Sequence, residues 1–102
     1  MALMQITIIP WVEKRVSIAP YVAEIQKYLK SQKFPYQMND MSTIIEGDAG
    51  KLFNLAKKLH ELSFAQGSQR VYTVLALDER RDKKVSLGDK VKSVQKNFDD
   101  RL

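Results

Sequence analysis

A dense run of charged residues follows an apolar segment in the last third of the chain. Residues 70–77 are mostly apolar and have the pattern of a β-strand. The next six residues, 78–83, read Asp-Glu-Arg-Arg-Asp-Lys. Two adjacent arginines framed by acids can form forked ion pairs with carboxylates or can grip an anion such as a phosphate. Arg80 and Arg81 are therefore candidate ligand residues. The favoured alternative is a network of ion pairs between subunits.

A second candidate is the carboxylate of Glu46. It stands in a predicted strand directly before Gly47, where it could accept a hydrogen bond from an exocyclic amine or face a cation at a subunit junction. The alternatives are an ordinary edge carboxylate and an ion pair between subunits. Thr7 and Thr43 could add hydroxyl contacts, although threonines are frequent in strands for their β-propensity alone.

Catalysis and metal binding find little support in the residue types. The chain has no cysteine and a single histidine, His60, which excludes thiolate sites and predicts no metal site. A nucleophile would have to be Ser17, Ser42 or Thr43 with His60 as its base, but no glycine-flanked nucleophile turn is present. No phosphate-cradling glycine loop or dinucleotide fingerprint occurs either. We expect a protein that is not an enzyme and has no cofactor, with His60 as a packing residue.

Length and charge narrow the class of protein further. The 102 residues predict one domain, 1–102, of a size that only just buries its own core. The net charge of +5 could suit nucleic acid, but the lysines and arginines are spread over several predicted helices and mixed with acids, so we expect no nucleic-acid partner. No export leader and no apolar stretch near the ~20 residues that span a bilayer is visible. The sequence thus predicts a cytoplasmic protein without a membrane partner.

The elements that must position the candidate residues begin with a strand and a helix. Residues 4–9 alternate with the period of a half-buried strand, and Pro10 is expected to end it. Ser17 is the predicted N-cap of the helix that follows. The apolar stripe of that helix consists of Ile18, Val22, Ile25 and Leu29.

Turn and cap residues then organise the middle of the chain. Residues 35–38 and 41–46 predict two short strands, and Asn39-Asp40 between them predicts a hairpin turn. Asp48 is a natural cap for the next helix, and Gly67 is expected at its C-terminal end. Along the sequence, both predicted strands of this hairpin therefore lie between two predicted helices.

The remaining elements complete the fold class. Residues 70–77 predict a strand and residues 87–98 an amphipathic terminal helix. The order strand, helix, strand, strand, helix, strand predicts an α+β fold, the ferredoxin-like βαββαβ sandwich, with an additional C-terminal helix. Two helices can cover only one face of such a sheet. The other face should carry Gln5, Thr7, Ile44, Glu46, Tyr72, Val74 and Ala76, and a bare face of this kind marks an interaction surface, most simply between copies of the chain.

The chain also resembles a known family over nearly its whole length. The resemblance rests on Ser17 with Tyr21-Val22-Ala23-Glu24, Tyr36, Thr43-Ile44-Ile45-Glu46-Gly47, His60-Glu61, Gly67, Arg70-Val71, Arg80-Arg81-Asp82-Lys83 and Lys90-Val91-Lys92-Ser93-Val94. It is similar to the UPF0045 thiamine-binding proteins of the MTH1187 type, which are related to YkoF. The resemblance implies a ferredoxin-like fold with an extra C-terminal helix, dimers that pair into tetramers, and binding of thiamine or its hydroxymethylpyrimidine half.

Three residues depart from the pattern of that family. Ser42 stands where a glycine is common, Ala19 where a second serine is common, and Glu79 where an aspartate is common. Ser42 narrows any space over the hairpin, which bears on the identity of the ligand more than on the fold. The resulting hypothesis is a non-catalytic small-molecule binding protein with Glu46, Thr43, Thr7, Ser17, Arg80 and Arg81 as candidate ligand-binding residues. The alternative is a structural or regulatory homodimer or homotetramer without a thiamine ligand.

Overall fold

A four-stranded antiparallel sheet carries two helices, and a third helix follows the last strand. The computed structural model describes residues 1–12 and 17–100. The elements are β1 (Ala2–Trp11), α1 (Ala19–Gln32), β2 (Tyr36–Met38), β3 (Thr43–Gly47), α2 (Ala49–Ala65), β4 (Arg70–Glu79) and α3 (Asp89–Asp100), and the strand order is β2-β3-β1-β4. This order confirms the predicted ferredoxin-like α+β fold with its additional C-terminal helix.

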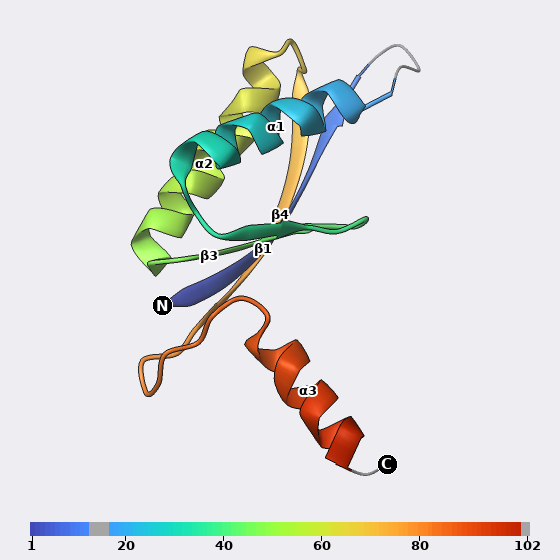
Figure 1. Cartoon of the computed structure of the whole chain (residues 1–102). Helices are drawn as coiled ribbons and strands as arrows, with labels where there is room; N and C mark the ends of the chain where they lie inside the picture. The colour runs from blue at the N-terminus through green and yellow to red at the C-terminus, as the bar shows by residue number, and fades with distance from the viewer. Residues whose placement is uncertain (13–16, 101–102) are drawn as a thin grey trace.

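The helices lie in unequal positions around the sheet. Helices α1 and α2 lie together over one face, whereas α3 leaves the opposite side of the molecule and projects away from it (Figure 1). The core between the sheet and the two helices consists of Ala2, Met4, Ile6, Ile25, Leu29, Ile45, Leu52, Leu55, Ala56 and Leu59. Because α3 contributes no residue to this core, its apolar stripe has to be explained separately.

Strand β1 shows the predicted alternation and is longer than predicted. Met4 and Ile6 are buried under the helices, and Gln5 on the other face is exposed. The expectation that Pro10 ends the strand is wrong, since Pro10 lies within β1 opposite Val71 of β4. A proline is tolerated in a strand where its missing N–H would have pointed to an unpaired edge. Strand β3 pairs with β1 only as far as Ile6, so Pro10 has such an edge.

The predicted N-cap of α1 is displaced by one residue. Ile18 is the N-cap and makes no side-chain capping bond, while Ser17 accepts a hydrogen bond on Oγ from the Ala19 N–H at 3.1 Å. Pro20 occupies the first turn, as predicted, where its lack of an N–H costs nothing. Ser17 therefore orders the entry to α1 without serving as its cap.

The hairpin and the caps of α2 confirm the turn chemistry. Asn39 donates its N–H to the carbonyl oxygen of Ser42 at 2.8 Å across the hairpin turn. Asp48 caps α2, with its carboxylate accepting from the Lys51 N–H at 3.3 Å. Gly67 follows the helix with a φ of +104°, a left-handed conformation that a side chain would disfavour. These local signals were sufficient to position the strands and α2 in the sequence.

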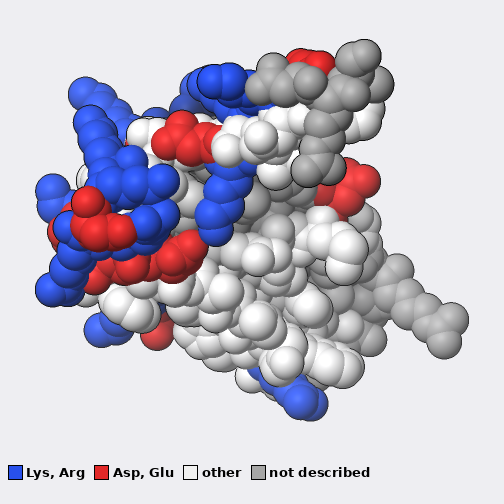
Figure 2. All heavy atoms as spheres, turned by 90° about the horizontal axis from the view of Figure 1, so that it is seen from below, with Lys and Arg blue, Asp and Glu red and all other residues white. Residues whose placement is uncertain are grey.

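The face of the sheet opposite α1 and α2, here called the open face, carries the residues predicted for it. The register aligns Leu3 with Glu46, Gln5 with Ile44 and Ala76, and Thr7 with Val74, so these side chains share one face. Tyr72 is 56% exposed and Val74 is 48% exposed. Seen from below, charged side chains of both signs gather at one side of the molecule, and most of the remaining surface is uncharged (Figure 2).

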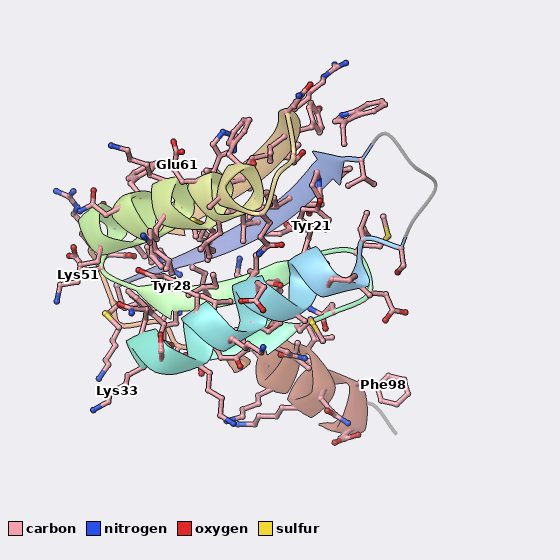
Figure 3. All side chains as sticks on the ribbon, turned by 90° about the horizontal axis from the view of Figure 1, so that it is seen from above. Tyr21, Tyr28, Lys33, Lys51, Glu61 and Phe98 are labelled. Carbon is pink, nitrogen blue, oxygen red and sulfur yellow. The ribbon has the colours of Figure 1, made fainter. Side chains whose placement is uncertain are left out.

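Helix α3 has an apolar stripe that this chain does not cover. Val91, Val94 and Phe98 are each more than half exposed. Phe98 points away from the rest of the chain (Figure 3). None of the described helices is long and apolar enough to cross a membrane.

Candidate functional site

The six candidate ligand-binding residues fall in separate parts of the fold. Thr7 and Thr43 lie where β1 passes the end of β3, and both line the same cleft. Glu46 lies on the open face near the other end of β3, opposite Leu3. Arg80 and Arg81 lie beyond β4, and Ser17 precedes α1. The fold thus brings two of the six together and keeps the others apart.

The cleft at Thr7 and Thr43, here called the hairpin cleft, arises from unequal strand lengths. Strand β3 begins at Thr43, opposite Ile6, while β1 continues to Trp11. Residues of the β2–β3 hairpin and of the first half of α1 line the space beside the longer strand. The cleft has a volume of about 370 Å³. Its lining is Ile6, Thr7, Ile8, Ile9, Ile18, Val22, Ile25, Gln26, Met38, Asn39, Asp40, Met41, Ser42 and Thr43.

Polar groups from three elements meet in the hairpin cleft. Gln26 of α1 directs its amide nitrogen Nε2 at Thr43 Oγ1, 3.4 Å away. Thr7 donates its hydroxyl to the carbonyl oxygen of Met41 at 2.9 Å. Asp40, in the hairpin turn, supplies a carboxylate at the rim. The cleft therefore offers a donor and acceptor pair and one negative charge within otherwise apolar walls of Ile, Val and Met side chains.

Glu46 makes a bond within its own chain. Its Oε1 accepts a hydrogen bond from the Leu87 N–H at 2.7 Å, and the residue is only 9% exposed. Leu87 belongs to the segment between β4 and α3, so the carboxylate tethers that segment to the open face. This charge-assisted hydrogen bond gives Glu46 a structural role, because it holds the segment before α3 against the sheet. Its predicted role toward a ligand stays a prediction.

The charged turn forms the forked ion pairs that its sequence indicates, and it forms them within one chain. Arg80 donates Nε to Asp82 Oδ1 at 2.9 Å and bonds the second carboxylate oxygen through its terminal nitrogen, and Arg81 pairs with Glu79 at 2.8 Å. The Arg80 guanidinium lowers the pKa of the Asp82 carboxyl, and the same hydrogen bond raises the pKa of Arg80. Because Arg80 is paired with Asp82, an anion would have to compete with that carboxylate.

A smaller pocket lies beside this turn. It has a volume of about 170 Å³ and is lined by Met1, Leu3, Asp78, Arg80, Lys83, Lys84, Val85, Asp89, Lys90 and Ser93. Lys90 of α3 bonds Asp78 of β4 across it at 3.3 Å. Small-molecule sites usually run from about 300 to 1,000 Å³, so the hairpin cleft is the better match for an organic ligand.

His60 and Trp11 lie away from the hairpin cleft. His60 Nδ1 is 2.7 Å from Thr73 Oγ1 of β4, and its ring packs edge-on against Phe64 at 5.2 Å between centroids. Trp11 carries the Arg70 guanidinium over its ring at 4.8 Å. Both contacts link neighbouring elements, and neither residue lines the hairpin cleft. These contacts agree with the predicted packing role of His60.

Sequence reasoning missed Gln26, Asp40 and Met41 as lining residues. Gln26 reads as an ordinary polar residue of an amphipathic helix, and turn geometry alone accounts for Asp40 in the sequence. Met41 is 86% exposed at the hairpin tip. The one available signal was the unequal length of the first and third strands, and the expected end at Pro10 concealed it.

Comparison with known proteins assigns the family. The family model described as "Thiamine-binding protein" matches residues 4–95. The chain is 41% identical to the UPF0045 protein YqgV of Bacillus subtilis, over 96% of this chain and 98% of that protein. It is 40% identical to the UPF0045 protein in the glkA 3′ region of Staphylococcus xylosus, over 98% and 97%. The chain therefore belongs to the thiamine-binding protein family.

A solved structure supports the same relationship. The crystal structure of protein MJ1052 from Methanocaldococcus jannaschii is 28% identical to this chain and superimposes with a TM-score of 0.81. The match covers 92% of this chain and 95% of that chain. Because the match covers nearly the whole of both chains, it supports the fold described above.

Proposed function

We propose that this protein binds thiamine or its hydroxymethylpyrimidine half in the hairpin cleft, without catalysing a reaction. Membership of the thiamine-binding protein family supports the class of ligand. One observation supports the position of the proposed binding site. Gln26 Nε2 and Thr43 Oγ1 lie 3.4 Å apart inside a cleft of about 370 Å³. The pocket beside the charged turn also has a polar pair, Lys90 and Asp78, but its volume is only about 170 Å³.

The chemistry of thiamine suits the lining of the cleft. An aminopyrimidine carries nitrogen acceptors and an amine donor, and Thr43 and Gln26 provide hydrogen-bonding partners for groups of this kind. Its flat ring needs an apolar wall, which Val22 and Met38 supply, and methionine sulfur packs favourably against aromatic rings. The thiazolium cation needs nearby negative charge, and Asp40 stands at the rim.

Titration calorimetry of the purified protein with thiamine, thiamine phosphate and hydroxymethylpyrimidine tests the proposal. Thr43→Val removes the hydroxyl while keeping the shape of the side chain, and we expect roughly a fivefold or larger loss of affinity. Thr73→Val is the matched control, because Thr73 is also a strand threonine bonded to another side chain, but lies outside the cleft. Equal losses in the two variants, or no binding of any of the three compounds to the unmodified protein, would contradict the proposal.

The remaining candidates define competing positions for the ligand. Glu46→Gln tests a site on the open face, and Arg80→Glu with Arg81→Glu tests an anion site at the charged turn. Ser17 is exposed at the entry to α1 and is the least constrained candidate. We expect these changes to leave thiamine affinity within about twofold if the ligand occupies the hairpin cleft.

We also infer that the protein acts in the cytoplasm as a homodimer or homotetramer. Two apolar surfaces support self-association: the open face around Tyr72 and Val74, and the stripe of α3 with Val94 and Phe98. Exposed apolar patches of this kind usually mark interaction surfaces. If thiamine and its fragments fail to bind while the oligomer forms, the structural or regulatory alternative gains support.

A further inference from the structure

Strand β1 loses one of its two neighbours along the hairpin cleft. It pairs with β4 as far as Trp11, but with β3 only as far as Ile6. Among the described residues, no strand lies beside β1 on the β3 side beyond Ile6. An unpaired strand edge presents backbone N–H and C=O groups that can bind an added partner.

The ladder identifies which residue presents those groups. The Glu46 N–H donates to the Pro35 carbonyl at 2.9 Å, so even-numbered residues of β3 direct their backbone groups toward β2. Odd-numbered residues of β3 therefore face β1, where Thr43 lies opposite Ile6. Because the direction alternates along a strand, Ile8 is the next residue of β1 whose N–H and C=O point to that side.

The hairpin does not complete the ladder at Ile8. A continued register would place Met41 opposite Ile8 and join the Ile8 N–H to the Met41 carbonyl. That carbonyl instead accepts the hydroxyl of Thr7 at 2.9 Å. In the part of the chain that the structure describes, no hydrogen bond joins the Ile8 backbone to the hairpin. Ile8 and Met41 both line the hairpin cleft, so the gap between them belongs to the cleft.

We propose that the backbone of Ile8 reads the aminopyrimidine edge of the ligand, an inference that rests on the proposed function. The Ile8 N–H donates to the ring nitrogen beside the exocyclic amine, and the Ile8 carbonyl accepts from that amine. The flat ring then continues the sheet at the point where the ladder with β3 stops. Thr7 serves as a positioning residue, because its hydroxyl occupies the Met41 carbonyl and leaves the Ile8 N–H available.

Backbone recognition differs from side-chain recognition in one measurable way. A threonine hydroxyl can donate or accept, and a glutamine amide can turn over, so Thr43 and Gln26 adapt to either hydrogen-bond pattern. The N–H and C=O of Ile8 have fixed roles. Oxythiamine, in which an oxo group replaces the amine and the ring nitrogen carries a proton, reverses both roles of the ligand. We therefore expect oxythiamine to bind roughly 100-fold more weakly than thiamine, since two bonds are lost together.

A pair of substitutions isolates the backbone donor. Ile8→Ala and Ile8→Pro both replace the branched side chain of Ile8 with a smaller one, but only Ile8→Pro removes the N–H. The strand tolerates proline at this phase, because Pro10 already occupies the same edge two residues along. Calorimetry should give roughly 5- to 150-fold weaker thiamine binding for Ile8→Pro than for Ile8→Ala.

The outcomes separate this inference from the proposed function. If the unmodified protein binds thiamine and oxythiamine equally well, or if Ile8→Pro binds thiamine as well as Ile8→Ala does, Ile8 is not the recognition edge, although thiamine binding stands. If neither thiamine nor hydroxymethylpyrimidine binds, the proposed function and this inference are both overturned. Should Ile8→Pro fail to fold, as judged by circular dichroism, the oxythiamine comparison on the unmodified protein decides alone.

Discussion

The two faces of the sheet are built from alternate residues of the same strands, yet their surroundings differ. On the covered face, Met4 and Ile45 are fully buried beneath α1 and α2. On the open face, Tyr72 and Val74 are about half exposed, and the segment before α3 is bonded to it at Glu46. Hence the covered face supplies the stability of the single chain, whereas the open face remains available for association.

The largest expected effect on stability comes from creating a cavity in the core beneath the covered face. Leu59 of α2 is completely buried in the core, and Leu59→Ala should lower the free energy of unfolding by about 2–5 kcal/mol. Urea denaturation of a dilute sample measures this. Val74→Ala on the open face, in the same dilute conditions, should cost less than about 1 kcal/mol. Equal costs would mean that the two faces are equally packed within one chain.

Charge placed on the open face should disturb assembly more than folding. Val74→Lys introduces an ammonium at the centre of the proposed contact, and we expect the dissociation constant of the oligomer to rise at least about tenfold, or about 1.4 kcal/mol. Light scattering over a concentration series reports the change. Asn54→Lys, on the exposed side of α2, adds the same charge away from that face. If the unmodified protein remains monomeric throughout the series, the open face is not a contact between copies of the chain.

The tether between Glu46 and Leu87 should have a smaller, local effect. Glu46→Gln replaces a charge-assisted bond with a neutral one, which should cost about 1 kcal/mol. Hydrogen exchange at the Leu87 amide should then become about fivefold faster, while amides in β1 keep their protection. Glu61→Gln, at an exposed position of α2, serves as the control. Unchanged exchange at Leu87 would indicate that the tether does not order the segment before α3.

The charged turn should contribute least to folding. The lowered pKa of Asp82 means that its pair with Arg80 stabilises the fold above the ordinary pKa of an aspartate, and that this contribution disappears as the pH falls through the lowered value. Because both side chains are exposed, solvent screens the pair. Melting temperatures of Asp82→Asn and the unmodified protein should therefore differ barely at pH 7, and even this difference should disappear as the pH falls through the lowered pKa of Asp82. A large difference at neutral pH would show that the turn is buried by a partner.

Local signals predicted most of the fold. The alternation of β1, the turn at Asn39-Asp40, the cap at Asp48 and the left-handed Gly67 each act over a few residues, so each could be recognised in the sequence. Two predictions of element ends were wrong, each for its own reason. Pro10 continues β1 because β3 has already ended beside it, and the N-cap lies at Ile18 because Pro20 fixes the first turn.

The sequence by itself determined the order of the elements and the residues of each sheet face. Only the tertiary structure decided the hairpin cleft, because it depends on where one strand stops beside another. Thr7 and Met41 are 34 residues apart, and Gln26 and Thr43 are 17 apart. No local pattern records such distances, since they result from the register of β1 with β3 and from the packing of α1 over that pair.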